Sequence, residues 1–399
     1  MLRTHGCLLL AILLFALPNI SAATEVKEWT FLVFLNGHND LDQYGASNMK
    51  QMERVGSTDK VNVVVQWASM ASPTTKRIYV KKSTNAEVVT SPAVEELSPV
   101  DMGNPNSLIE FVRWAKERYP ARHYFIDVWN HGSGWHRINK IGGEAHQDDI
   151  SWDERFNSHI TTKQLGAAMQ VISRELGQKV DVYGSDACLM AMAEVAGEMK
   201  NSVEVFVGAE ETEPGDGWPY DQLLAEWNKK ERATASDVGQ ILVREYVKAY
   251  SGGQFGKEEV TLSAMKMSNW NRFESAFKSF SSEMRSLDAA ERAAVLRVAA
   301  NTQSYQYSDY KDLFHFTQGL AAANLPSVGR SSLARLQESL NDLILENGVT
   351  GEYRNSRGIS LWVPDTRYQY DAHAKAYQSL AFHQATSWGQ VLARLFPKK

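Results

Sequence analysis

Two residues of this sequence have the chemistry of a nucleophile and its base. Cys188 ends the stretch GSDAC that follows an apolar segment at 180–183, and His131 lies in the stretch NHGSGW that follows another at 124–129. A thiol becomes a strong nucleophile as a thiolate, and a nearby imidazole can take its proton. Reactive groups of open α/β sheets gather where strands end, so we expect both side chains at one sheet edge. The pattern predicts a cysteine–histidine pair for acyl transfer.

The backbone around this pair could take part in the chemistry. Cys188 directly precedes an amphipathic segment at 189–199, and the first N–H groups of a helix there would favour a thiolate. The N–H groups of Gly132 and Cys188 could together bind the oxyanion of a tetrahedral intermediate. The alternative is structural, because a strand-end histidine is usually hydrogen-bonded into the framework and a buried cysteine is usually inert.

The cysteine count bears on that choice. The 399 residues contain two cysteines, Cys7 and Cys188. Residues 1–23 have the pattern of a signal peptide, with an apolar run at 7–18 that is too short to span a bilayer and small residues after it. An uncleaved membrane anchor is the alternative. After cleavage Cys188 would be the sole thiol of an exported chain, so it is expected to be either buried or kept for chemistry.

Charge limits the classes of partner. The formal net charge is −5, and loss of Arg3 with the signal peptide makes it −6. Such a chain has no basic footprint for nucleic acid or anionic lipid. We therefore expect a periplasmic or secreted protein that binds no nucleic acid and, after cleavage, no membrane.

The elements that must position the pair alternate along the first half of the chain. Continuous apolar runs are typical of parallel strands covered on both faces, and amphipathic helices lie between them. Asp40 and Asp42 are expected to start the first helix. The predicted strands are 30–35, 61–67, 124–129, 180–183 and 203–207, the predicted helices are 41–55, 107–119, 161–176 and 189–199, and a hairpin is predicted at 77–80 and 87–89.

The second half reads differently. Helical patterns dominate it, at 220–227, 235–250, 271–287, 289–300, 313–323, 331–346 and 379–396, with strand candidates at 260–265 and 358–363. No repeat or low-complexity linker separates the halves. We predict an α/β fold with a mostly parallel sheet flanked by helices and a largely helical C-terminal region packed on it. The expected division is a signal peptide at 1–23, a catalytic α/β core at 24–218 and a mainly helical region at 219–399 that contributes one or two strands.

The motifs around the pair resemble the clostripain family of cysteine peptidases. That family is related to caspases, legumain and gingipains and has a caspase-like fold. The resemblance rests on N-H-G-x-G-W after one strand and S-D-A-C-L-M after the next. It extends over most of the mature chain, through segments 29–34, 39–41, 211–218 and 357–361 and Trp388.

The resemblance implies roles for particular residues. His131 matches the catalytic histidine and Cys188 the nucleophile. The family cuts after Arg or Lys, and Asp186 and Asp216 match its two pocket acids. Two carboxylates in a narrow slot suit a guanidinium or an ammonium. The alternatives are a helix N-cap for Asp186 and a turn residue for Asp216.

The sequence indicates less specifically which residues are involved in self-cleavage and in metal binding. The resemblance implies self-cleavage after a basic residue between the two catalytic segments, for which Lys140, Arg155 and Lys163 are candidates. Calcium is linked to some members, and Asp148 and Asp149 are weak candidates for it within an acidic loop that could equally be solvated. The chemistry itself requires no cofactor.

Other enzyme classes lack their motifs in this sequence. There is no H-E-x-x-H or C-x-x-C for zinc, no phosphate-binding glycine loop after a strand, and no G-x-S-x-G. The prediction is a secreted cysteine endopeptidase that cleaves proteins or peptides after Arg or Lys through an acyl-enzyme. The alternatives are an exported, non-catalytic binding or scaffold protein of this fold, and a cysteine amidase or transpeptidase.

Overall fold

The centre of the structure is a large, mostly parallel sheet. The computed structural model describes residues 26–136 and 149–397, and within them nine strands join in the order β14-β12-β9-β8-β5-β1-β2-β3-β4. The strands from β2 to β9 in that order are parallel, and both edges are antiparallel. The bounds are β1 Lys27–Gly37, β2 Val61–Ser69, β5 Ala121–Trp129, β8 Val180–Asp186 and β9 Val203–Gly208 in the parallel part, and β3 Thr75–Tyr79, β4 Ala93–Leu97, β12 Thr261–Lys266 and β14 Ile344–Val349 at the edges.

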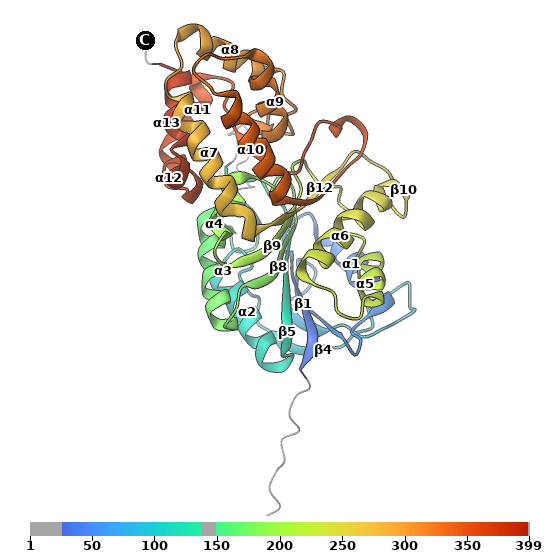
Figure 1. The fold of residues 1–399 in the computed structure, drawn as a ribbon. Coiled ribbons are helices and arrows are strands. Elements are labelled where there is room, and N and C mark those ends of the chain that lie inside the picture. The colour runs from blue at the N-terminus through green and yellow to red at the C-terminus, as the bar shows by residue number, and fades with distance from the viewer. Residues whose placement is uncertain (1–25, 137–148, 398–399) are drawn as a thin grey trace, which may run out of the picture.

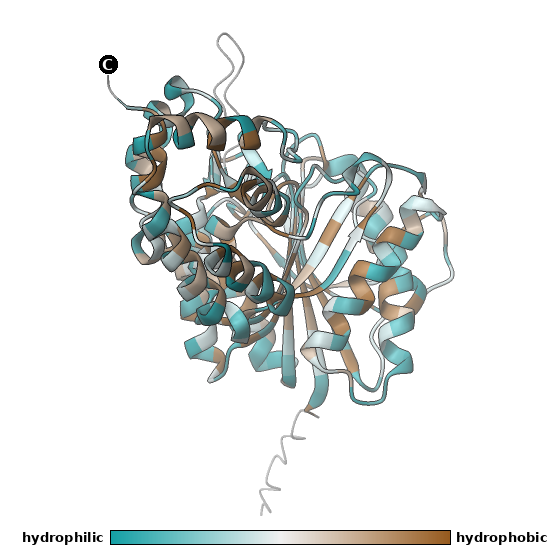
Figure 2. Ribbon diagram, turned by 45° about the horizontal axis from the view of Figure 1, so that its top comes forward, coloured by the Kyte–Doolittle hydropathy of each residue, from teal (hydrophilic) through white to brown (hydrophobic). Residues whose placement is uncertain are grey.

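Helices cover both faces of this sheet, which explains its continuous apolar strands. In β1, Phe31 and Val33 pack into one core and Leu32 and Phe34 into the other, all fully buried. A strand buried on both sides cannot alternate with polar residues. Figure 1 shows the two helix layers and Figure 2 their apolar inner sides: α1 Asp42–Val55, α5 Tyr220–Lys229 and α6 Ala235–Tyr250 on one face, and α2 Pro105–Arg118, α3 Thr162–Leu176 and α4 Ala193–Met199 on the other. The predicted fold class is confirmed.

Local capping fixes where several of these helices begin. The Thr161 side chain accepts a hydrogen bond from the N–H of Gln164, and the Gln164 side-chain oxygen accepts one from the N–H of Thr161, so α3 starts with a capping box. Thr234 and Asp237 do the same for α6. The side chain of Asn104 caps α2, which has a proline at its first position.

The segment after Cys188 departs from its prediction. The expected helix 189–199 is wrong in its first half, because α4 begins only at Ala193. Leu189 has a φ of 65°, and the N–H groups of Leu189 and Ala191 donate to carbonyl oxygens of the segment that follows β9. This pairing holds the backbone out of a helix. Cys188 therefore does not sit at a helix N-terminus.

The predicted hairpin forms, but its second strand is misplaced. β3 pairs with β4 at Ala93–Leu97, not with residues 87–89. The buried Glu53 carboxylate accepts hydrogen bonds from the N–H groups of Thr90 and Ser91. These N–H groups are bound to a side chain and are not available for a strand at this point.

The C-terminal region both extends the sheet and adds a helical layer. The predicted strand 260–265 forms as β12, and the end of the predicted helix 331–346 becomes β14. The predicted helix 379–396 is divided at Ser387, which has a φ of 60°. Predictions for α6, α8 and α9 match the observed bounds. The layer at the top of Figure 1 contains α7 Trp270–Met284, α8 Ala289–Ala300, α9 Leu313–Ala323, α10 Arg330–Leu343, α11 Arg367–Tyr377, α12 Ala381–Thr386 and α13 Trp388–Leu395.

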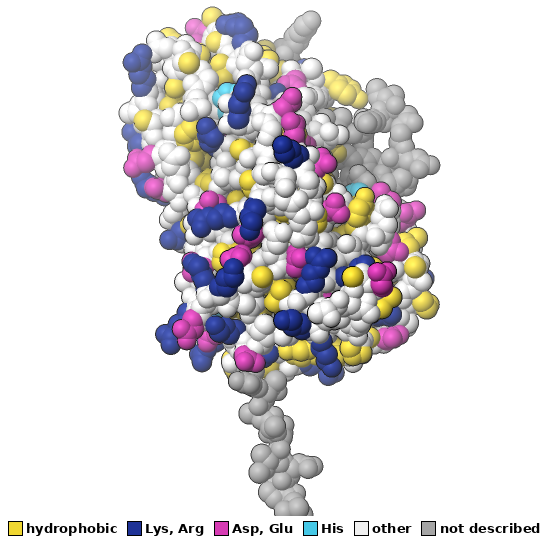
Figure 3. Space-filling view, turned by 90° about the vertical axis from the view of Figure 1, so that its right-hand side faces the viewer, with side chains coloured by type: hydrophobic (Ala, Val, Ile, Leu, Met, Phe, Trp, Pro, Cys, Tyr) yellow, Lys and Arg dark blue, Asp and Glu magenta, His cyan; other side chains and the backbone are white. Residues whose placement is uncertain are grey.

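Short two-stranded sheets complete the described part of the chain. The predicted strand 358–363 forms as β15, but it pairs outside the main sheet with β13. The face in Figure 3 mixes acidic and basic side chains, with hydrophobic ones scattered among them. Across residues 26–136 and 149–397, none of the helices combines the length and apolar character needed to span a bilayer. The short strands are β6 Ile150–Asp153, β7 Ser158–Ile160, β10 Ser251–Gly253, β11 Gly256–Lys257, β13 Tyr310–Asp312 and β15 Ser360–Trp362.

Candidate active site

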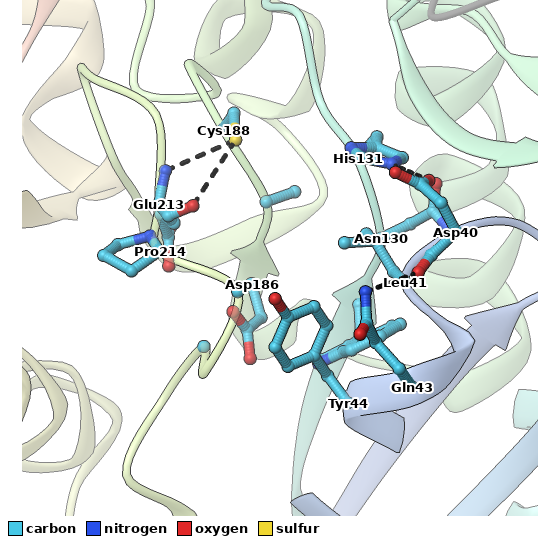
Figure 4. A pocket seen from close by; sticks show the side chains of 14 residues that line it. Asp40, Leu41, Gln43, Tyr44, Asn130, His131, Asp186, Cys188, Glu213 and Pro214 are labelled. Atoms are coloured by element: carbon cyan, nitrogen blue, oxygen red, sulfur yellow. Dashed lines mark hydrogen bonds and ion pairs between the residues drawn. The ribbon is translucent and has the colours of Figure 1, made fainter. Parts of the chain in front are cut away.

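A pocket of about 260 Å³ opens at the carboxyl ends of β5 and β8. Its lining includes His131, Cys188 and Asp186, so the structure brings these three predicted residues together. Figure 4 shows Cys188 on one side of the pocket and His131 on the other. The loop 213–217 and the start of α1 complete the walls.

The histidine side of the pocket is open and has a defined hydrogen bond. His131 Nε2 lies 2.7 Å from Asp40 Oδ1, and the Asp40 side chain is 75% exposed. An ionised carboxylate only accepts hydrogen bonds, which assigns the N–H to Nε2 and leaves Nδ1 as the basic nitrogen. Asp42 starts α1 as predicted, whereas Asp40 pairs with the histidine.

On the other side of the pocket, the Cys188 side chain is partly buried. Cys188 Sγ accepts a hydrogen bond from the Glu213 N–H at 3.3 Å and lies 4.0 Å from the Glu213 carbonyl oxygen. Burial raises the pKa of the Cys188 thiol to about 12. Within the described residues no hydrogen bond joins Cys188 to His131. This arrangement therefore holds the thiol in its neutral form.

A shared proton lies at the floor of the pocket. Tyr220 Oη lies 2.8 Å from Asp127 Oδ2 and 2.7 Å from Asp186 Oδ2. One hydroxyl proton serves only one of these contacts, so the other carboxyl must itself be protonated and donate to the hydroxyl oxygen. Burial raises the pKa of Asp127 well above its usual range and that of Asp186 to about 6. Burial thus favours a protonated form of this pair, and Asp186 is the member that lines the pocket.

Glu213 adds a third acid. Its two carboxylate oxygens are buried and have no hydrogen-bond partner among the described residues. Burial, reinforced by Asp186 and Asp127, raises the pKa of Glu213 well above its usual range. The structure does not bring Asp216 into the pocket: its side chain is exposed, and its carbonyl oxygen accepts a hydrogen bond from Asn48.

The two predicted oxyanion donors lie beside each other. A side chain at Gly132 would collide with the carbonyl oxygen of Cys188, so only glycine permits this approach. Among the described residues, the N–H groups of Gly132 and Cys188 donate to no other group. They are thus available to an incoming oxygen.

The sequence reasoning missed the roles of three residues, two that line this pocket and one buried beneath it. Asp127 had a detectable signal, because a carboxylate inside the apolar run YFIDVW requires a buried partner. Glu213 lies in the segment 211–218, from which Asp216 was chosen instead. Nothing in the sequence distinguished Asp40 from a helix-start residue.

The processing and calcium candidates are only partly covered by the structure. Asp148 and Lys140 lie outside the described residues. Asp149 Oδ2 accepts a hydrogen bond from the Thr162 N–H at 2.5 Å. Among the described side chains, no group of three or more His, Cys, Asp or Glu is arranged to hold a metal ion. Calcium binding stays a prediction.

Comparison with known proteins gives one family. The sequence profile of the clostripain family matches residues 33–394. Clostripain from Hathewaya histolytica is 28% identical over 137 residues, which is 31% of this chain but only 24% of the length of clostripain.

Two solved structures share the fold. A secreted C11 cysteine protease from Bacteroides thetaiotaomicron, solved with an irreversible peptide inhibitor, has a TM-score of 0.69 at 18% identity. An inactive zymogen C11 protease from Parabacteroides distasonis has a TM-score of 0.66, also at 18% identity. Each comparison covers 91% of this chain and 99% of the other.

Proposed function

This chain belongs to the clostripain family, and we propose that it is a cysteine endopeptidase cleaving after Arg or Lys, with Cys188 as nucleophile and His131 as base. The observation that carries the proposal is the common pocket of a thiol, an imidazole and an acidic floor. The peptide inhibitor bound to the Bacteroides protease of the same fold supports peptides as the substrate class.

The proposed reaction begins when the Cys188 thiol transfers its proton to Nδ1 of His131. The thiolate attacks the scissile carbonyl carbon, and the N–H groups of Gly132 and Cys188 bind the resulting oxyanion. His131 protonates the leaving amine, which gives a thioester and a free new N-terminus. His131 then takes a proton from water, the hydroxide attacks the thioester, and the carboxylic product leaves as the thiol is restored.

Asp40 is a positioning residue in this mechanism. By accepting the Nε2–H, it keeps Nδ1 directed at the reaction and stabilises the imidazolium that forms. Because Asp40 is largely exposed, the contribution of its charge is screened by water.

The proposed preference for Arg or Lys follows from the negative charge of the pocket. The pocket lining contains Asp186 and Glu213 but no Lys or Arg among its described residues. A guanidinium or ammonium entering it would meet the carboxylates with few competing cations, whereas an apolar side chain would leave them unpaired. We also propose export, on the pattern of residues 1–23, which lie outside the described part of the chain.

The test is hydrolysis of an arginyl amide by purified Cys188→Ala, Cys188→Ser and His131→Ala variants. We expect each to lower kcat by about 10³-fold or more, as for members of other catalytic pairs. Circular dichroism checks that the variants are folded. Unchanged hydrolysis by Cys188→Ala would remove the mechanism, and a wild-type protein that cleaves leucyl amides as well as arginyl amides would remove the specificity.

A further inference from the structure

Both the backbone and the side chain of Glu213 contribute to the pocket. Its backbone N–H holds the Cys188 sulfur at 3.3 Å, while its carboxylate lines the cavity that receives the substrate side chain. No other residue that lines the pocket hydrogen-bonds to the thiol, within the described part of the chain.

The side-chain end of Glu213 lacks a partner. Both carboxylate oxygens are buried without a hydrogen bond among the described residues, although a buried carboxylate normally has several. Asp186, the Trp218 indole and the Tyr246 hydroxyl lie beside it, and none of them makes a complete hydrogen bond to its carboxylate. The carboxylate can therefore still accept hydrogen bonds from a ligand or pair with a cation that the ligand carries.

The same carboxylate opposes ionisation of the nucleophile. Of the carboxylates around Cys188, Glu213 raises the pKa of the thiol most, followed by Glu211 and Asp186. The titratable groups around the Glu213 carboxylate are acids and phenols, not cations. They are Asp127 from β5, Asp186 from β8, Tyr220 from α5, and Tyr246 and Tyr250 from α6. Each further negative charge in this cluster is therefore costly.

We propose that Glu213 couples pocket occupancy to the reactivity of Cys188, so that a bound substrate cation pairs with its carboxylate and permits the thiol to transfer its proton to His131. The coupling rests on the proposed function, because the cation is the side chain of an Arg or Lys substrate. In the empty pocket the thiol is neutral and protected. Once the cation offsets the negative charge of the cluster that contains Asp186 and Glu213, the cluster opposes ionisation of the thiol less, and the Glu213 N–H remains to stabilise the thiolate.

The experiment measures the thiol without using peptide cleavage. Wild-type protein is alkylated with iodoacetamide, a small neutral reagent, and the rate at Cys188 is followed by mass spectrometry. Methylguanidine serves as the substrate cation, and methylurea as its uncharged matched control. We expect methylguanidine to accelerate alkylation by about five- to tenfold, as for neutralising one nearby charge, and methylurea to leave the rate unchanged.

Two variants locate the effect. Glu213→Gln is expected to react faster than wild type without additive, and to lose the response to methylguanidine. Asp216→Asn, an acid of the same loop outside the pocket, should respond like wild type. If Glu213→Gln fails to fold, the comparison of methylguanidine with methylurea on the wild-type protein still decides the proposal.

Slower alkylation in methylguanidine, an equal effect of methylurea, or a full response in Glu213→Gln would each overturn the coupling. A wild-type protein that hydrolyses arginyl amides but shows no acceleration would keep the proposed function and lose this coupling. Acceleration of alkylation without any hydrolysis of arginyl amides would keep the coupling and remove the proposed function.

Discussion

The structure contains two clusters of buried acids that differ in how their oxygens are satisfied. The pocket cluster is Asp127, Asp186 and Glu213, and the rim cluster is Glu210 and Asp312. Burial raises the pKa of both Asp186 and Asp312 to about 6, so burial alone does not distinguish the clusters.

The difference lies in the donors. In the rim cluster, Asp312 accepts backbone hydrogen bonds from His315 at 2.5 Å and Arg357 at 2.6 Å, and Glu210 accepts one from Gly358 at 2.9 Å. These bonds tie the start of α9 to the loop before β15. In the pocket, Asp186 accepts a backbone hydrogen bond from Trp218 at 3.1 Å, but neither carboxylate oxygen of Glu213 has a partner among the described residues. One oxygen of Glu210 in the rim cluster is likewise without a partner there. The backbone N–H groups that bind Asp312 hold the chain together, whereas the Glu213 carboxylate is available to a ligand.

The largest expected effect tests the pocket half of this comparison. Asp186→Asn keeps the shape of the side chain but removes its charge. We expect kcat/KM for arginyl and lysyl amides to fall by about 10²- to 10³-fold, the cost of leaving a buried cation unpaired. Steady-state kinetics measure this, with a leucyl amide and the Asp312→Asn variant as controls. A comparable loss in Asp312→Asn would erase the distinction between the clusters.

The second prediction tests the rim half. Asp312→Ala leaves the buried N–H groups of His315 and Arg357 without acceptors and removes the cap of α9. We expect the free energy of unfolding to fall by about 2–4 kcal/mol. Urea denaturation followed by circular dichroism measures it. Asp186→Asn should lose less than about 1 kcal/mol, because it removes a costly buried charge. Equal losses in the two variants would contradict the comparison.

A third, smaller effect concerns pH. The pKa of each acid rises from 3.8 when unfolded to about 6 when folded. Between these values the folded state binds more protons, so both acids make stability fall as pH rises from about 4 to about 6. Either Asn variant should flatten this slope in urea titrations. Methylguanidine should flatten it in wild type and Asp312→Asn, and flatten it less in Asp186→Asn; an equal response of all three would count against a pocket-specific ligand.

The smallest effect is expected at Asp216. Because its side chain is exposed outside the pocket, Asp216→Asn should change kcat/KM for arginyl amides by less than about twofold, the range of an exposed charge. The same kinetic assay measures it. A loss comparable to that of Asp186→Asn would show that the loop moves Asp216 into the pocket when substrate binds.

The strands and the pair of His131 and Cys188 could be predicted from the sequence because each of their patterns lies within a short stretch of the chain. An apolar run such as 30–35 reports burial on both faces. The ends of the runs containing Phe125 and Val182 placed His131 and Cys188 at one edge, since those strands are neighbours in the sheet.

The rest depends on partners distant in sequence. α4 starts late because Leu189 and Ala191 bond to the segment after β9. Asp127 accepts a hydrogen bond from Tyr220, 93 residues further along the chain. Glu213 owes its place in the pocket to a loop whose turn no pattern specified, so the sequence pointed to Asp216 instead.

The order in which the sheet closes has a consequence for how the chain folds. β9 pairs with β12, which begins at Thr261, and β12 pairs with β14, which begins at Ile344. Until β12 has been synthesised and has paired with β9, β9 presents an unpaired edge to any other strand nearby. Such long-range closure slows folding and exposes nascent chains to aggregation, so refolding from denaturant should succeed best at low protein concentration.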